Sequence, residues 1–155
     1  MTDMADLEKR ISVLEDIEAI KKVQAKYWRC NAEKLWDEIV DCFTEDAALE
    51  FGPNLQIKGA DEIKNFYSSS MSSSADIIDI RVPQGHNPEI EIRSDGTANG
   101  KWLVYLYAIS EQSRSRRSIS AYYDNEYVKQ GGQWKIKTCL LQTLLSETST
   151  WGTGF

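Results

Sequence analysis

His86 is the only histidine in the chain of 155 residues, and it lies in the stretch QGHNPEI, residues 84–90. An imidazole titrates near pH ~6.5, so at neutral pH it can accept a proton, as a general base must. Histidines also serve as hydrogen-bonding groups inside proteins and at pocket rims. Two hypotheses therefore stand for His86: it is a catalytic base, or it is a structural or pocket-rim histidine.

The cysteines and glycines do not form motifs that hold metals or cofactors. Cys30, Cys42 and Cys139 are odd in number and widely spaced, which favours reduced, buried thiols over a disulfide framework or a zinc site. One histidine and scattered cysteines offer no cluster of metal ligands. The nine glycines are scattered through predicted turns and form no loop that would cradle a phosphate. We therefore expect no metal and no cofactor.

The charge balance and hydropathy of the chain argue against two classes of partner. The net charge is −6 and the pI is near 4.9, so the summed field repels phosphate backbones and argues against nucleic-acid binding. The one basic cluster, residues 114–117 (RSRR), lies between two predicted strands and is typical of a solvated hairpin loop. No run approaches the ~18 apolar residues that a membrane span needs. The acidic start, MTDMADLEKR, is unlike a secretory signal, so we expect a cytoplasmic protein.

The length fits one domain, residues 1–155, whose first half is patterned for helices. Seven apolar residues recur at three- and four-residue spacing, which puts them on one face of a helix: Leu7, Ile11, Leu14, Ile17, Ile20, Val23 and Tyr27. Ser12 and Glu15 match a capping box, so this segment can also be two helices that break near Ser12. A second helix is predicted over residues 33–43. A third is predicted over 61–71, and it ends in the serine-rich run 68–74.

The second half of the chain is patterned for strands. A short hairpin is predicted over residues 48–57, and long strands are predicted over 97–109, 118–129 and 134–145. Before them, Ile90 and Ile92 alternate with glutamates, which is the period of a strand. Helices first and long antiparallel strands afterwards indicate the α+β class: one curved antiparallel sheet with the helices packed across its concave side. Such an arrangement leaves room for a pocket.

Two runs of residues carry a family resemblance. YWRCNAEKLWD, residues 27–37, followed by FTEDA, residues 43–47, resembles the helical signature of SnoaL-like proteins of the nuclear transport factor 2-like superfamily. This resemblance implies a cone-shaped, curved antiparallel sheet that is closed by N-terminal helices. Within the superfamily, the stretches DIEAIK (16–21), GHNPEI (85–90), GKW (100–102) and QW (133–134) are similar, in order, to the bile-acid dehydratase of steroid metabolism.

The resemblance implies a catalytic pair that this chain lacks. Related enzymes use a histidine as the base and an aspartate that orients it and stabilises the imidazolium. By spacing, the aspartate position falls on Ala32 and the histidine position on Pro83. A further aspartate and an arginine of the dehydratase pocket fall on Leu106 and Thr143. The cavity is therefore expected to be drier and less charged than that of the dehydratase.

The resemblance also suggests which side chains form the site. Tyr27 matches a tyrosine that donates a hydrogen bond to substrate, although its place on a buried helix face also fits a core tyrosine. His86 matches a second histidine outside the pair, and three positions along a strand reverse the side on which a residue points, unless a bulge at Gly85 restores it. The expected substrate-binding residues, of which the aromatic ones could equally be ordinary core, are Asn31, Phe51, Trp102, Leu106 and Thr143.

Two hypotheses about function follow from the sequence and the resemblance. The first is a lyase or isomerase, dehydratase-like in ancestry, that acts on a hydrophobic hydroxylated or aromatic ring compound through Tyr27 and His86 in a rearranged site. The alternative is a non-catalytic module for small-molecule binding or assembly on the same fold, because a fold does not determine a function. The resemblance further implies a homodimer or homotrimer that forms through the outer face of the sheet.

Overall fold

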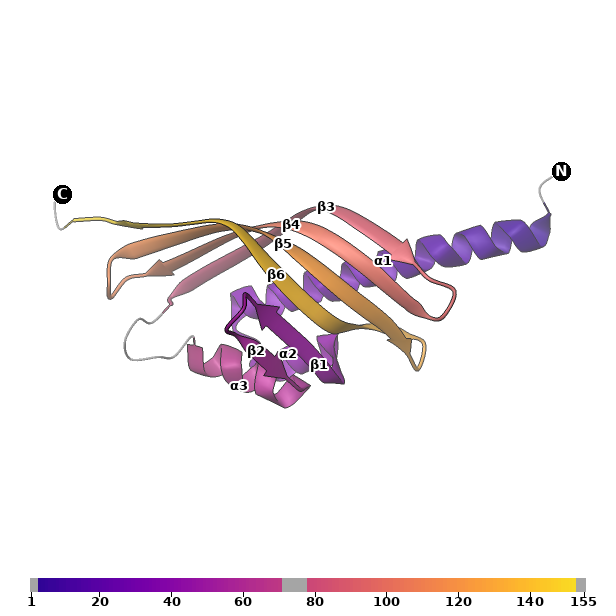
Figure 1. Cartoon of the computed structure of the whole chain (residues 1–155), viewed down its shortest axis with the longest axis horizontal. Helices are drawn as coiled ribbons and strands as arrows, with labels where there is room; N and C mark the ends of the chain where they lie inside the picture. The colour runs from indigo at the N-terminus through magenta and orange to yellow at the C-terminus, as the bar shows by residue number, and fades with distance from the viewer. Residues whose placement is uncertain (1–2, 71–77, 153–155) are drawn as a thin grey trace.

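The computed structural model describes residues 3–70 and 78–152 of the chain. In chain order its elements are α1 (Met4–Glu33), α2 (Trp36–Ile39), the 3-10 helix η1 (Val40–Cys42), β1 (Phe43–Phe51), β2 (Gln56–Lys58), α3 (Ala60–Ser70), β3 (Ile80–Ile92), β4 (Thr97–Ser110), β5 (Ser115–Gln130) and β6 (Gln133–Thr150). N-terminal helices lie against a single curved sheet (Figure 1). The expected α+β class is confirmed.

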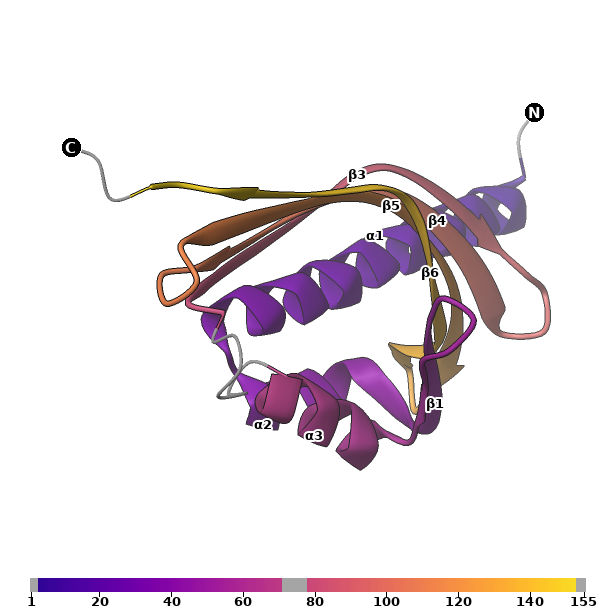
Figure 2. The ribbon, with the colours of Figure 1, turned by 60° about the vertical axis from the view of Figure 1, so that its left-hand side comes forward.

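The six strands follow the order β2-β1-β6-β5-β4-β3. All neighbouring strands are antiparallel except β1 and β6, whose parallel pairing the sequence analysis did not anticipate. The sheet bends over the helices, which lie on its concave side (Figure 2). Since β3 is an edge strand, Pro83 can sit within it without removing a hydrogen bond from the middle of the sheet.

Helix α1 is continuous through Ser12, so the alternative of two helices is wrong. Lys34 ends it in the left-handed conformation, with φ of 59° and its N–H bonded to the Cys30 carbonyl. Only the second half of α1 is buried, because the first half extends past the sheet (Figure 1) and leaves Ile11 and Leu14 54% and 62% exposed. Among the described residues, no helix combines the length and apolar character that a membrane span requires.

The other two helices differ from the prediction at their ends. The second is short and passes into η1, because Phe43 leaves the helix to pair with Ile136 of β6, which buries its ring. The third is confirmed over Ala60–Ser70. The rest of the serine-rich run lies outside the described residues.

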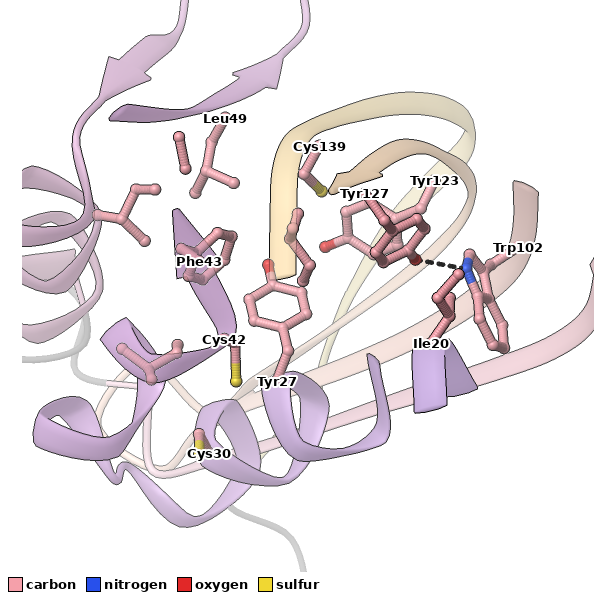
Figure 3. Packing of buried hydrophobic residues seen from close by; sticks show 14 of the residues in the cluster. Ile20, Tyr27, Cys30, Cys42, Phe43, Leu49, Trp102, Tyr123, Tyr127 and Cys139 are labelled. Atoms are coloured by element: carbon pink, nitrogen blue, oxygen red, sulfur yellow. Dashed lines mark hydrogen bonds between the residues drawn. The ribbon is translucent and has the colours of Figure 1, made fainter. Parts of the chain in front are cut away.

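Aromatic side chains from the helices and the sheet meet in the core (Figure 3). A buried polar network ties α1 to this part of the sheet. The Trp102 indole N–H donates to the Tyr127 hydroxyl at 2.9 Å, and that hydroxyl donates to the Gln24 amide oxygen at 2.7 Å. Asn125 also donates to the Gln24 amide oxygen, at 2.9 Å. These bonds compensate for burying polar atoms and fix the position of α1 on the sheet.

Candidate functional site

A cavity of about 860 Å³ lies between α1, α3 and the concave face of the sheet. Its walls are largely apolar, and their apolar side chains include Phe51, Phe66, Val104, Leu106, Ile119 and Leu141. Polar side chains enter from α1, β3, β5 and β6: Asn31, Arg81, Arg117, Tyr123, Gln142 and Thr143. A volume of this size accommodates a ligand with several rings.

Four of the expected substrate-binding residues border this cavity: Asn31, Phe51, Leu106 and Thr143. Strand alternation explains the position of Leu106, because Val104 and Ala108 border the cavity on the same face of β4. The four residues come from α1, β1, β4 and β6, so the fold brings distant parts of the sequence together.

His86 is not at the cavity. The side of β3 that carries Gly85 faces the helix, since a Cβ at Gly85 would overlap the Trp28 ring. His86 is exposed on the opposite face and pairs with Leu103. The register shift of β3 follows His86 and precedes Glu89, so the alternative in which a bulge at Gly85 turns His86 inward is wrong. Because His86 is the only histidine, no imidazole reaches the cavity.

Tyr27 is a core residue and does not border the cavity. It is fully buried, and its hydroxyl lies 2.5 Å from that of Tyr67. Its ring meets Phe43 edge-on, with 5.3 Å between centroids (Figure 3). Burial, with the neighbouring Tyr123, raises the pKa of Tyr27 well above its ordinary value, so the phenol stays protonated at neutral pH.

Trp102 also lies in the core instead of at the cavity. It is 5% exposed, and its indole N–H is occupied by Tyr127. The tryptophan that borders the cavity is Trp28, whose ring meets Trp102 edge-on at 5.2 Å between centroids. Trp28 follows Tyr27 in sequence, but it is not among the residues at three- and four-residue spacing, so that spacing did not predict that Trp28 would face the sheet.

The two positions expected to replace the catalytic pair differ in their surroundings. Pro83 borders the cavity on β3, whereas Ala32 is exposed. The residue of that helical turn that reaches the cavity is Asn31, which is 2% exposed. Neighbouring helical residues are turned by about 100° from each other, so Asn31 and Ala32 lie on different sides of α1. The Asn31 amide, and not the Ala32 methyl group, therefore borders the cavity.

Arg81 is a cavity residue that the sequence analysis missed. Arg81 lies between Ile80 and Val82 in the sequence. The alternation of apolar and polar residues predicts that Ile80 and Val82 face the core and that Arg81 faces solvent. In the structure they are 47% and 38% exposed on the outer face, and Arg81 faces inward. Arg117 borders the cavity as well, so the expected loss of charge is offset by two guanidinium groups.

The tyrosine at the cavity wall is a hydrogen-bond donor at neutral pH. Burial raises the pKa of Tyr123 well above its ordinary value, and its ring lies 6.3 Å from that of Tyr27 between centroids. Among the described residues, no group of three or more His, Cys, Asp or Glu side chains is placed to hold a metal ion. The site therefore presents hydrogen-bond donors and amide side chains within largely apolar walls.

Of the residues that the structure describes, Glu50 is the only acidic one that borders the cavity. Its strand neighbours Leu49 and Phe51 face the core and the cavity, so alternation turns the Glu50 side chain toward the other face of the sheet. There it borders a second hollow together with Asn99 and Asp124. The C-terminal end of β1 thus brings the Glu50 carboxylate near the cavity, but the side chain points to the other face of the sheet.

Comparisons with known proteins agree with this architecture. Residues 12–139 match the model of the SnoaL-like domain. A candidate scytalone dehydratase from Novosphingobium aromaticivorans DSM 12444 is similar in structure, with a TM-score of 0.81, 21% identity, and 94% of this chain and 93% of that chain covered. The type 2 hexachlorocyclohexane dehydrochlorinase LinA matches with a TM-score of 0.82 and 17% identity, over 94% of this chain and 96% of that chain.

A third solved structure is also similar to this chain. The LinA-type3 dehydrochlorinase from Novosphingobium barchaimii LL02 has a TM-score of 0.81 and 15% identity, with 94% of this chain and 99% of that chain covered. At these identities the likeness concerns the fold. Function has to be argued from the residues of this cavity.

Proposed function

The chain belongs to the SnoaL-like family, and we propose that it binds a hydrophobic ring-containing small molecule in the cavity between α1 and the sheet. The observation that carries this proposal is the cavity itself: about 860 Å³ with largely apolar walls and no imidazole. Apolar ring surface gains free energy when it leaves water, at about 25 cal/mol per Å². A ligand with one or two polar groups would match the few polar side chains of the walls.

Binding without turnover is favoured because no base among the described residues is placed at the cavity. His86 lies outside, Tyr27 is sealed in the core, and Tyr123 is held protonated. Asn31 lies on the cavity side of α1. A carboxylate at this place could stabilise a protonated base, but the neutral Asn31 amide does not.

A dehydratase-like lyase is the second candidate, since structurally similar proteins include the candidate scytalone dehydratase and dehydrochlorinases. In this reaction the Glu50 carboxylate would take a proton from the carbon next to the C–OH carbon. The C–H electrons would form the double bond, the C–O bond would break, and Tyr123 would protonate the departing hydroxide to water. This route requires Glu50 to turn inward from the position described above.

Binding is tested by calorimetric titration of the purified protein with naphthoate and naphthamide. Saturable binding of either compound is expected. Ala121 borders the cavity, so Ala121→Phe should fill part of it and weaken binding by about tenfold or more, which corresponds to about 1.4 kcal/mol. Ser120 pairs with Tyr105, which is exposed on the other face of the sheet. Ser120→Phe is therefore the matched control and should bind as the wild type does.

Turnover is tested with tetralol, a hydroxylated two-ring compound that would yield dihydronaphthalene and water. The binding function predicts no product above the uncatalysed rate. Formation of dihydronaphthalene by the wild type, with its loss in Glu50→Gln, would replace the binding proposal with the lyase. No saturable binding of naphthoate or naphthamide would refute the proposal.

A further inference from the structure

Arg81 is unusual because strand β3 turns this charged side chain toward the cavity and leaves the aliphatic side chains on either side of it exposed. Ile80 and Val82 are exposed on the outer face while the arginine between them borders the cavity. A strand that only needed a core would turn its aliphatic residues inward. Local sequence rules that are broken in this way are typical of binding sites.

Within the described part of the chain, the charge of Arg81 is incompletely matched. No carboxylate of the described residues lies within ion-pair distance of it, and its buried Nε has no hydrogen-bond acceptor among them. The guanidinium carbon lies 5.7 Å from the centre of the Tyr67 ring, which stabilises the cation from one side only. A half-buried guanidinium without an anion is unfavourable, and an anionic ligand would relieve it.

Other polar atoms next to the cavity also lack partners within the described part of the chain. They are the Trp28 indole nitrogen and the Asn31 amide oxygen, and both residues border the cavity. Asn31 is 2% exposed, so its amide is shielded from water. Buried polar groups are nearly always bonded, so a bound molecule is the natural partner for these atoms.

A second arginine adds to the positive charge on this face. Arg81 pairs with Ala108 across β3 and β4, and Ala108 pairs with Arg117 across β4 and β5. The three residues lie in a row on the cavity face, where neighbouring strands are about 4.8 Å apart. This part of the cavity is cationic although the whole chain carries a net charge of −6.

We infer that the ligand is a hydrophobic ring compound that bears a carboxylate. The carboxylate accepts hydrogen bonds from the Arg81 guanidinium, which suits a two-oxygen acceptor, and the rings pack against the apolar walls around Leu106 and Phe51. This inference rests on the proposed binding function and specifies its ligand class.

The test compares naphthoate with naphthamide, which keep the ring and differ in charge. Charge-assisted bonds to arginine should make the wild type bind naphthoate about tenfold or more tightly than naphthamide. Arg81→Met should remove that preference and leave naphthamide affinity within about twofold of the wild type. Arg81→Lys should keep part of the preference. The matched control is Arg116→Met. Arg116 precedes Arg117 in β5, is exposed and does not border the cavity, so this variant should bind both compounds as the wild type does.

The outcomes separate this inference from the function on which it rests. Equal affinity of the wild type for both compounds would overturn the carboxylate inference while the binding function stands. Equal weakening of both compounds by Arg81→Met would assign the arginine to packing and would also overturn it. Binding of neither compound would refute the function and the inference together.

Discussion

At the scale of single residues, the hydroxyl of Tyr27 contributes to stability, because it is fully buried against the hydroxyl of Tyr67 at 2.5 Å. Tyr27→Phe should lower the free energy of unfolding by about 1–2 kcal/mol, since it removes one buried hydrogen bond. Urea unfolding followed by fluorescence measures this. Tyr122→Phe, at a half-buried position of β5 where the ring lies beside Lys101, is the control and should change the free energy by less than about 0.5 kcal/mol. Equal stability of Tyr27→Phe and wild type would contradict the assignment.

Gly85 is required because the Trp28 ring lies where a Cβ would be. Gly85→Ala should destabilise the fold by about 1–3 kcal/mol, the usual cost of overpacking. Combining it with Trp28→Leu should recover part of that loss, because the smaller side chain leaves room. Gly152→Ala meets no neighbouring atom and is the matched control in the same thermal unfolding assay. A fully stable Gly85→Ala variant would mean that Trp28 can move away at little cost.

Sequence reasoning found part of the cavity and missed the rest for physical reasons. Leu106 and Thr143 could be placed by counting from a recognised motif, since strand positions two apart share a face. Arg81 could not be found from the pattern, because Ile80 and Val82 gave the strand the opposite apparent polarity. Placing Asn31 relative to Ala32 depends on the rotation of α1, and residue spacing alone does not fix it.

At the scale of elements, the long strands were predictable and the helix ends were not. Strands β4 to β6 have one face on the core, so their apolar residues alternate with the period that the sequence displays. Phe43 begins β1 because it pairs with Ile136, nearly a hundred positions away, and no local pattern encodes that pairing. The same holds for the parallel pairing of β1 with β6.

Asp16 anchors α1 to the β5–β6 hairpin. Its carboxylate accepts hydrogen bonds from Lys129 at 2.7 Å and from the Trp134 indole at 2.8 Å. Burial opposes ionisation, but the bonds from Lys129 and Trp134 outweigh it and lower the pKa of Asp16. The stabilisation is therefore fully present above the unfolded-state pKa of about 3.9 and is lost as the pH falls through the lower folded-state pKa.

Asp16→Asn should thus be less stable than the wild type at neutral pH, and the difference should shrink as the pH falls below about 3.9. Urea unfolding at a series of pH values measures it. Asp37→Asn is the control, because the Asp37 side chain is 93% exposed in its pair with Lys64 and should contribute little. A stability difference that does not vary with pH would show that the Asp16 charge is not what holds the helix.

At the scale of the whole molecule, the outer face of the sheet carries an apolar patch near its β3 edge. Ile80, Val82 and Tyr105 are 47%, 38% and 39% exposed, and the pairing of Gln84 with Tyr105 places them close together. Exposed apolar groups that cluster are typical of interfaces between proteins, and an edge strand is a common place for self-association. We propose that this patch, defined by Ile80, Val82 and Tyr105, joins copies of the chain into a homodimer or homotrimer.

Val82→Lys should convert this oligomer to a monomer, because a desolvated ammonium would sit in the centre of the contact. Sedimentation velocity at one fixed protein concentration measures the mass. Ile11→Lys is the matched control: it adds the same charge at a position 54% exposed, on the part of α1 that extends past the sheet, and should stay oligomeric. Dissociation by Ile11→Lys but not by Val82→Lys would move the interface to α1. A monomeric wild type would remove the interface from the outer face altogether, and the exposure of Ile80 and Val82 would then be explained only by the inward placement of Arg81.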